Sequence, residues 1–226
     1  MEIWKSSKFE RSFVTSLGQA GFEKIACVIG ADIHKSAMQG YRLQGIISEG
    51  ELAYIGEVLR YLQHRNSKSV IPNWPTELSI LYNKISGSQK TITVISDIYI
   101  KTNDCEMFFE LKSSKPNADQ SLESKLKMLQ IQAIKRGNII ETYFALPDNL
   151  YGTKQKYNHP HPMRYFDMRN SPCVIMDKDF WDKLGGQGTW EELIAIFQEV
   201  GIKYKTRIKE EYFEGKNKQK TLSDFA

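Results

Sequence analysis

Apolar residues recur at helical spacing in the first part of the chain. Phe9, Phe13 and Leu17 repeat every four positions within residues 7–20, and apolar side chains in residues 48–65 repeat every three or four. This spacing places the apolar side chains on one side of a helix, so it predicts an amphipathic helix in each segment.

A third helix is predicted within residues 70–90. Proline favours the first turn of a helix, so Pro75 marks its start, and Gly87 is expected just beyond its end. Residues 1–88 are therefore expected to form a mainly helical N-terminal part.

The pattern changes to strand spacing after residue 88. Residues 91–100 and 105–112 are rich in β-branched and aromatic side chains, which predicts two strands. Asn103 and Asp104, between them, are typical of a tight turn. We therefore expect a β-hairpin.

The register of this hairpin brings two acids together. If Asn103 and Asp104 form a two-residue loop, Asp97 lies directly across from Glu110; a three-residue loop would move the pairing by one residue. Side chains alternate along a strand, so Lys112 is expected on the same face as both acids. That face is also expected to carry Tyr99 and Phe108, and the opposite face Ile92, Val94, Ile98, Ile100, Met107, Phe109 and Leu111.

Two carboxylates and a lysine on one face are typical of metal-dependent hydrolysis. Cross-strand Cβ atoms lie roughly 5 Å apart, so Asp97 and Glu110 repel each other unless a cation lies between them. Mg²⁺ prefers hard oxygen ligands and keeps several waters, and Lys112 could orient such a water or a phosphate oxygen. The alternative is a solvent-facing hairpin side whose Glu110 and Lys112 form an ordinary surface pair.

The tripeptide Glu-x-Lys is a weak signal by itself. It occurs at residues 110–112, 123–125 and 214–216. The first occurrence differs from the others because it lies in an apolar strand and has a second acid predicted opposite it.

Ser96-Asp97, followed by a turn and Glu110-Leu111-Lys112, resembles the active-site motif of the PD-(D/E)xK nuclease superfamily, with Ser96 in the position of the first proline. The runs ELKSSKPNADQ, ALPDNLYG and FWDKLGGQGTWEELIAIFQEVG further resemble type II restriction endonucleases, among them the subgroup that cuts GGNCC. The resemblance implies a restriction-endonuclease-like core that hydrolyses phosphodiester bonds of double-stranded DNA at a short recognition sequence.

The resemblance also implies roles for individual residues. Asp97, Glu110 and the carbonyl of Leu111 would bind Mg²⁺, and Lys112 would position the attacking water. Many enzymes of this superfamily add a glutamate from an N-terminal helix. Glu10 and Glu51 are the candidates for this auxiliary acid, and the alternative for each is an ordinary acid at the edge of an apolar stripe or in the first turn of its helix.

A helix is predicted directly after the hairpin. Asn117 and Gln120 have the spacing of a capping box, and the apolar face that follows consists of Leu122, Leu126, Leu129 and Ala133. Lys115 and Asn117 flank the helix start and are candidate DNA contacts. The exposed positions of this helix are expected to include Lys125, Lys127, Lys135 and Arg136. These residues would either contact phosphates or form a solvated face.

Two further strands are predicted within residues 138–147 and 172–178, completing a mixed sheet. The polar, aromatic loop between them offers Asn158, Arg164 and Arg169 as candidate DNA contacts, with an ordinary surface loop as the alternative. The glycine-rich run that starts at Gly185 lacks the order of a nucleotide-binding loop, so it is expected to join two helices.

Composition is that of a folded, mildly basic protein. The chain has 226 residues, 41% of them hydrophobic, and a formal net charge of +4, which permits a polyanionic partner without establishing one. Three widely spaced cysteines suggest neither a disulfide framework nor a zinc site. No export signal or membrane segment is recognisable, so a cytoplasmic location is expected.

Together these features predict an α/β fold in one nuclease domain, residues 1–226, whose central mixed sheet is flanked by helices. Its catalytic core is expected at 89–200 and a flexible tail at 214–226. The function expected is that of a type II site-specific deoxyribonuclease acting as a homodimer, because a palindrome presents two related strands. A cognate DNA methyltransferase would be its functional partner. A repair or structure-specific nuclease and a non-catalytic DNA-binding module are the alternatives.

Overall fold

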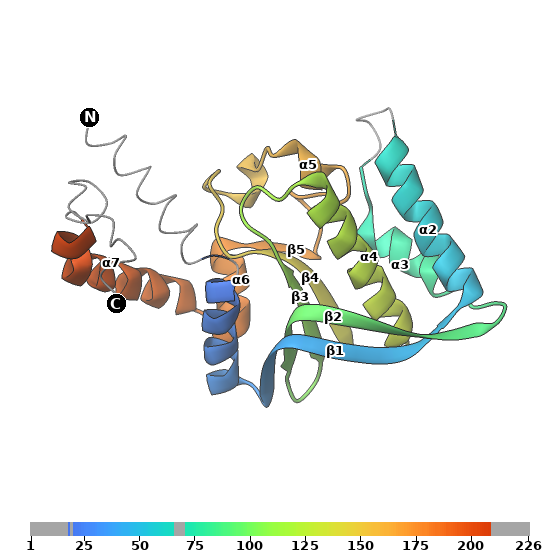
Figure 1. Cartoon of the computed structure of the whole chain (residues 1–226), viewed down its shortest axis with the longest axis horizontal. Helices are drawn as coiled ribbons and strands as arrows, with labels where there is room; N and C mark the ends of the chain where they lie inside the picture. The colour runs from blue at the N-terminus through green and yellow to red at the C-terminus, as the bar shows by residue number, and fades with distance from the viewer. Residues whose placement is uncertain (1–17, 19, 66–70, 209–226) are drawn as a thin grey trace, which may run out of the picture.

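One five-stranded mixed sheet forms the centre of the computed structural model, which describes residue 18 and residues 20–65 and 71–208 (Figure 1). The strand order is β1-β2-β3-β4-β5; the first three strands are antiparallel, and β3, β4 and β5 are parallel. The strands are β1 (Ser36–Ser48), β2 (Gln89–Lys101), β3 (Glu106–Leu111), β4 (Ile140–Leu146) and β5 (Val174–Met176). The predicted α/β fold with a central mixed sheet is confirmed.

Helices cover both faces of this sheet. On one face pack α2, α3 and α4; on the other pack α6 and a helix over residues 20–33, and α7 extends beyond α6 (Figure 1). The labelled helices are α2 (Glu49–His64), α3 (Trp74–Leu81), α4 (Ala118–Ile134), α5 (Pro160–Met163), α6 (Asp177–Gly185) and α7 (Thr189–Ile208), with a short 3-10 turn, η1 (Lys154–Lys156). None of the described helices is long and apolar enough to cross a lipid bilayer.

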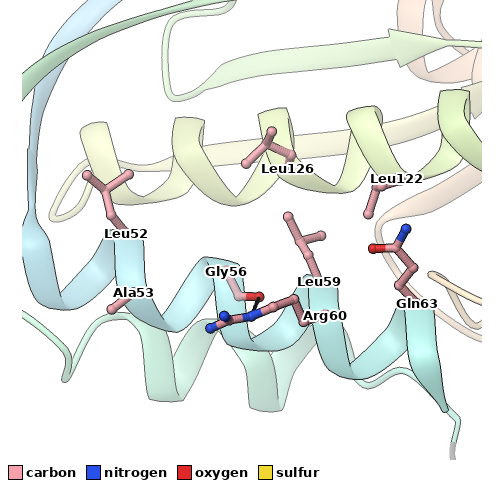
Figure 2. A pocket seen from close by; sticks show the side chains of 8 residues that line it. All are labelled: Leu52, Ala53, Gly56, Leu59, Arg60, Gln63, Leu122 and Leu126. Atoms are coloured by element: carbon pink, nitrogen blue, oxygen red, sulfur yellow. Dashed lines mark hydrogen bonds between the residues drawn. The ribbon is translucent and has the colours of Figure 1, made fainter.

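Local signals explain where the helices begin. Asn117 caps α4 in the predicted capping box with Gln120, and Asn73 caps α3 with Pro75 in its first turn. The predicted apolar face of α4 is also confirmed, since Leu122 and Leu126 line a groove against Leu52 and Leu59 of α2, as Figure 2 shows. Most of the helix predicted within residues 7–20 lies outside the described residues.

The register of the β2–β3 hairpin is the predicted one. The amide of Thr102 donates to the carbonyl of Cys105 over 3.0 Å, so Asn103 and Asp104 form a two-residue loop. Ile98 then pairs with Phe109, and the same register places Asp97 opposite Glu110.

The predicted face of Ile92 and Val94 is wrong. Val94, with Ile92 packed against it, lies in the same apolar cluster as Tyr99, whereas Ile98 lies in the cluster on the opposite face. Val94 and Tyr99 are five positions apart, so strict alternation would put them on opposite faces. The alternation therefore shifts by one between them, next to Asp97. Gly40, in the neighbouring strand, has φ +62° at this point, a conformation that favours glycine.

Strand β1 is a correction to the expectation that residues 1–88 are mainly helical. It is an edge strand in which only Leu43, Ile47 and Ser48 are buried, so its apolar signal is weak. Packing explains the glycine at position 45, because a side chain there would collide with Ile134 of α4. That contact is set by tertiary structure and leaves no local signal.

Two basic residues expected on the exposed face of α4 are engaged elsewhere. Lys125 is fully buried; its ammonium pairs with Glu77 of α3 and lies 4.6 Å from the centre of the Trp74 ring. Arg136 donates from Nε and Nη2 to the two carboxylate oxygens of Glu51, over 2.9 and 2.6 Å. Both ion pairs connect α4 to the N-terminal helices.

Removing the Arg136 guanidinium should destabilise the protein. Glu51 is completely buried, so Arg136→Met leaves its charge unpaired and is expected to lower the free energy of unfolding at pH 7 by about 3 kcal/mol. Burial alone would raise the pKa of Glu51, but hydrogen bonds from Arg136 and Ser48 outweigh it and lower that pKa. The loss should therefore shrink as acid protonates Glu51. Urea unfolding at pH 4 and 7 measures this loss of stability. Arg60→Met, at an exposed position of α2, is the control. Equal losses for the two variants, or equal losses at the two pH values, would contradict the proposed role of the ion pair.

Candidate active site

The structure brings the predicted catalytic residues together at the end of strand β3. Oδ2 of Asp97, on β2, accepts hydrogen bonds from the Leu111 amide at 2.8 Å and from Nζ of Lys112 at 2.9 Å. The same ammonium donates to the Leu111 carbonyl at 2.7 Å and lies 3.6 Å from Oε2 of Glu110. Asp97, Glu110, Lys112 and the Leu111 carbonyl thus form one cluster.

Burial distinguishes this cluster from a surface pair. The side chain of Glu110 is 1% exposed, that of Lys112 is 9% exposed and that of Asp97 is 16% exposed. Ionised groups are rarely buried unless they are paired. The alternative of a solvent-facing hairpin side is therefore wrong.

A second lysine enters the cluster from helix α4. Nζ of Lys127 lies 3.1 Å from Oε2 of Glu110 and 3.9 Å from Oδ1 of Asp97. Its side chain is only 20% exposed, so the expected solvated position is wrong for Lys127. The sequence predicts Lys127 on the exposed face of the helix, but how α4 crosses the sheet decides which residues it meets.

The buried carboxyl of Glu110 has the most strongly altered protonation in the cluster. Burial, with a smaller contribution from the negative charge of Asp97, raises the pKa of Glu110 to about 8, although Lys112 and Lys127 act in the opposite direction. Burial alone would lower the pKa of Lys127, but the carboxylates of Glu110 and Asp97 outweigh it and raise that pKa.

The cluster has the features of a divalent-cation site. Oε1 of Glu110 is buried and has no hydrogen-bond partner among the described residues, which is costly unless a ligand satisfies it. Two carboxylates and a carbonyl are the hard oxygen donors that Mg²⁺ prefers, with water completing the shell. Within the described part of the chain, no three His, Cys, Asp or Glu side chains gather to hold a metal, so the carbonyl and water would be needed.

Comparison with known proteins identifies the family. A family model described as "Type II restriction endonuclease, HinfI" matches residues 1–201. The chain belongs to this family. Two similar enzymes from Herpetosiphon aurantiacus are the type II restriction enzymes HgiCII, 32% identical over 211 residues (91% of this chain and 76% of the relative), and HgiEI, 31% identical over 205 residues (88% and 73%). No solved structure matches the chain.

As a type II restriction endonuclease, the chain is an endodeoxyribonuclease, a hydrolase that acts on double-stranded DNA. The resemblance to type II restriction endonucleases noted in the sequence is confirmed. Family membership sets aside the two alternatives, a repair nuclease and a non-catalytic DNA-binding module. Enzymes of this kind generally use divalent metal ions, in agreement with the oxygen-rich cluster.

For this restriction endonuclease, part of the predicted DNA-contacting set gathers beside the cluster. Lys115 and Asn117 are exposed in the segment that joins β3 to α4, and Asn158 is exposed in the loop between β4 and β5. This loop is fixed to that segment, since the buried Tyr157 hydroxyl donates to the carbonyl of Ser114 over 3.0 Å. Nε2 of His159 likewise lies 3.0 Å from the carbonyl of Pro116.

The two arginines of the predicted set have structural contacts. The exposed Arg164 donates to the carbonyl of Gln63 in α2, and Nε of Arg169 donates to the carbonyl of Tyr157 over 3.0 Å. Each therefore helps hold the loop in place. Sequence reasoning missed this role because the carbonyl partners are distant in sequence or lie within the loop's own fold.

The candidate auxiliary acids differ in what the structure says of them. Glu51 is the third residue of the capping box of α2, where it pairs with Ser48 and Arg136. None of the contacts described for Glu51 involves Asp97 or Glu110, so the structure gives it a stabilising role. Glu10 lies outside the described residues.

Replacing Glu110 by glutamine should stabilise the metal-free protein increasingly as pH rises. The carboxyl ionises near pH 4.5 in the unfolded chain but near 8 when folded, so rising pH favours unfolding of the wild type between these values. Glutamine cannot ionise and escapes this loss. Melting curves with a chelator from pH 5 to 8 should show a growing advantage of Glu110→Gln, absent in the exposed control Glu57→Gln. A pH-independent difference would contradict the raised pKa.

Proposed function

We propose that this chain is a Mg²⁺-dependent type II site-specific deoxyribonuclease with its active site at Asp97, Glu110 and Lys112. The observation that carries the proposal is the buried carboxyl of Glu110, whose Oε1 has no hydrogen-bond partner among the described residues, close to the Asp97 carboxylate and to the buried ammonium of Lys112. A buried oxygen without a partner is unfavourable, so a bound cation is the simplest way to satisfy Oε1 of Glu110.

The proposed ligands are the carboxylates of Asp97 and Glu110 and the carbonyl of Leu111. When bound, Mg²⁺ would lower the pKa of a coordinated water and offset negative charge on the scissile phosphate. The backbone contributes to this arrangement, because the Leu111 amide fixes Oδ2 of Asp97. The carboxylate is thus oriented before any ligand arrives.

Lys112 is proposed to position the attacking water. Its ammonium is held by Asp97 and by the Leu111 carbonyl, so its place beside the proposed metal ligands is fixed. Oε2 of Glu110 lies 3.6 Å from the same ammonium, beyond hydrogen-bond distance, so the third N–H donor can turn to a water or a phosphate oxygen.

We further propose that Lys115, Asn117, Asn158 and Arg164 contact DNA from the exposed edge next to the site. Positive charge at phosphates supplies most affinity, whereas amides such as Asn158 can read base edges. Arg169 would act indirectly by holding the loop, and Glu10 remains the proposed auxiliary acid. The proposed recognition sequence is of the GGNCC type.

Cutting both strands of a palindrome requires two active sites related by a two-fold axis, so we propose a homodimer. A cognate DNA methyltransferase is proposed as the functional partner, since an endonuclease of this kind would otherwise cut the DNA of its own cell. Both partners follow from the proposed reaction.

Digestion of unmethylated plasmid DNA tests the active site. The wild type is expected to give discrete fragments that require Mg²⁺, and sequencing of their ends would give the recognition sequence. Lys112→Ala and Asp97→Asn should each lower the cleavage rate at least about a thousandfold, because each removes transition-state stabilisation of several kcal/mol.

Lys135→Gln is the control for this digestion. It removes a lysine that pairs with Glu106 outside the proposed site, and it should cut like the wild type. If Lys112→Ala cut equally well, the assignment of the active site would be wrong. If no DNA were cut with either Mg²⁺ or Mn²⁺, the proposed cofactor would be wrong.

Mixed dimers test the proposed assembly. When wild-type chains are refolded together with an excess of Asp97→Asn chains, each mixed dimer holds one working site and should nick a single strand. Gel analysis of supercoiled plasmid should therefore show open-circular product building up. Accumulation of linear product alone, at a rate proportional to the wild-type fraction, would show that one chain cuts both strands.

A further inference from the structure

Lys127 reaches the two proposed metal-binding carboxylates from a third element, helix α4. Its ammonium contacts Oε2 of Glu110 at 3.1 Å and approaches Oδ1 of Asp97 at 3.9 Å. Lys112 contacts the other carboxylate oxygen of Asp97, Oδ2. The two lysines therefore reach the same oxygen of Glu110, Oε2, but different oxygens of Asp97.

A divalent cation held by both acids would share the carboxyl group of Glu110 with this ammonium. Mg²⁺ binds oxygen at about 2.1 Å, so a metal on Oε2 of Glu110 would lie within a few ångströms of Nζ of Lys127. Two positive charges at such a distance in a partly buried site repel strongly. The position of Lys127 therefore fits a metal-free site, because a metal ion on Oε2 would repel its ammonium.

We propose that Lys127 is an internal counter-cation, a positioning residue that neutralises the carboxylate pair until a metal ion displaces it. This inference rests on the proposed function, because it assumes that Asp97 and Glu110 are the metal ligands. It assigns Lys127 a role that differs from that of Lys112: Lys112 stays with Asp97 and the backbone, whereas Lys127 moves.

The helix provides a second partner for the displaced ammonium. Glu123, one turn earlier on α4, has Oε1 3.6 Å from Nζ of Lys127, and its side chain is 64% exposed. A rotation about the flexible lysine stem can therefore carry the charge from Glu110 towards Glu123 and solvent without breaking the helix. A purely structural ion pair would need no such alternative.

The same helix offers a matched pair for comparison. Nζ of Lys135 lies 2.7 Å from Oε2 of Glu106, so this pair also joins α4 to β3. The side chains of Lys127 and Lys135 are similarly buried, at 20% and 21% exposed. Glu106, however, is not among the proposed metal ligands.

Calorimetric titration with Ca²⁺ in the absence of DNA tests the proposal directly. Lys127→Gln is expected to bind Ca²⁺ at least about tenfold more tightly than the wild type, because the competing charge is gone. It should also melt at a lower temperature when metal-free and show a larger rise of melting temperature with Ca²⁺. Lys135→Gln should lower the melting temperature without changing the affinity for Ca²⁺.

A second variant keeps the test open if Lys127→Gln does not fold. Glu123→Gln, at an exposed position, removes the alternative partner and should weaken Ca²⁺ binding several-fold, whereas Asp119→Asn, exposed in the first turn of the same helix, should not. If Lys127→Gln does fold, the Glu123 effect should disappear in the double variant.

The outcomes separate this inference from the proposed function. Unchanged or weaker Ca²⁺ binding by Lys127→Gln, together with loss of binding in Glu110→Gln, would overturn the counter-cation role and leave the metal site standing. Unchanged binding in both Glu110→Gln and Asp97→Asn would overturn the metal site, and the role of Lys127 with it.

Discussion

The rest of the site depends on one buried carboxyl group, that of Glu110 at the end of strand β3. Its side chain is 1% exposed, and burial holds its pKa near 8, so the fold keeps it charged only at a cost in free energy. Lys112 and Lys127 reduce that cost from two directions, and neither supplies a partner for Oε1. A protein selected for stability alone would place an apolar residue here, which is why the group is best explained by a ligand.

This arrangement depends on the hairpin loop, on the path of strand β2 and on the position of helix α4. The two-residue loop sets Asp97 opposite Glu110, and the break in alternation near Ser96 lets Val94 and Tyr99 pack on the same face while Asp97 stays beside Lys112. Helix α4 supplies the second cation, and its ion pairs with the N-terminal helices fix where it lies. The stability of these distant pairs is thus connected to the geometry of the site.

Local sequence signals predicted the parts of the structure that short-range chemistry determines. Turn residues at Asn103 and Asp104 gave the hairpin register, and the capping box at Asn117 gave the start of α4. What failed depends on tertiary packing. Edge strand β1 buries only Leu43, Ile47 and Ser48 and so carries a weak apolar signal, and the burial of Lys125 depends on α3 packing over α4. The sequence predicts Lys127 on the exposed face, and the carboxylates it meets depend on a crossing angle that the sequence does not encode locally.

The Glu-x-Lys tripeptides show the physical reason why the same letters differ in meaning. In strand β3 the spacing of two residues puts Glu110 and Lys112 on one face, where their charged atoms lie 3.6 Å apart. In helix α4 the same spacing puts Glu123 and Lys125 on different sides: Glu123 is 64% exposed and pairs with Lys127, whereas the side chain of Lys125 is 1% exposed and pairs with Glu77. A spacing of two brings side chains together only where the backbone is extended. The motif therefore acquires its chemistry from the strand that carries it, and a search for these three letters needs the strand pattern beside them.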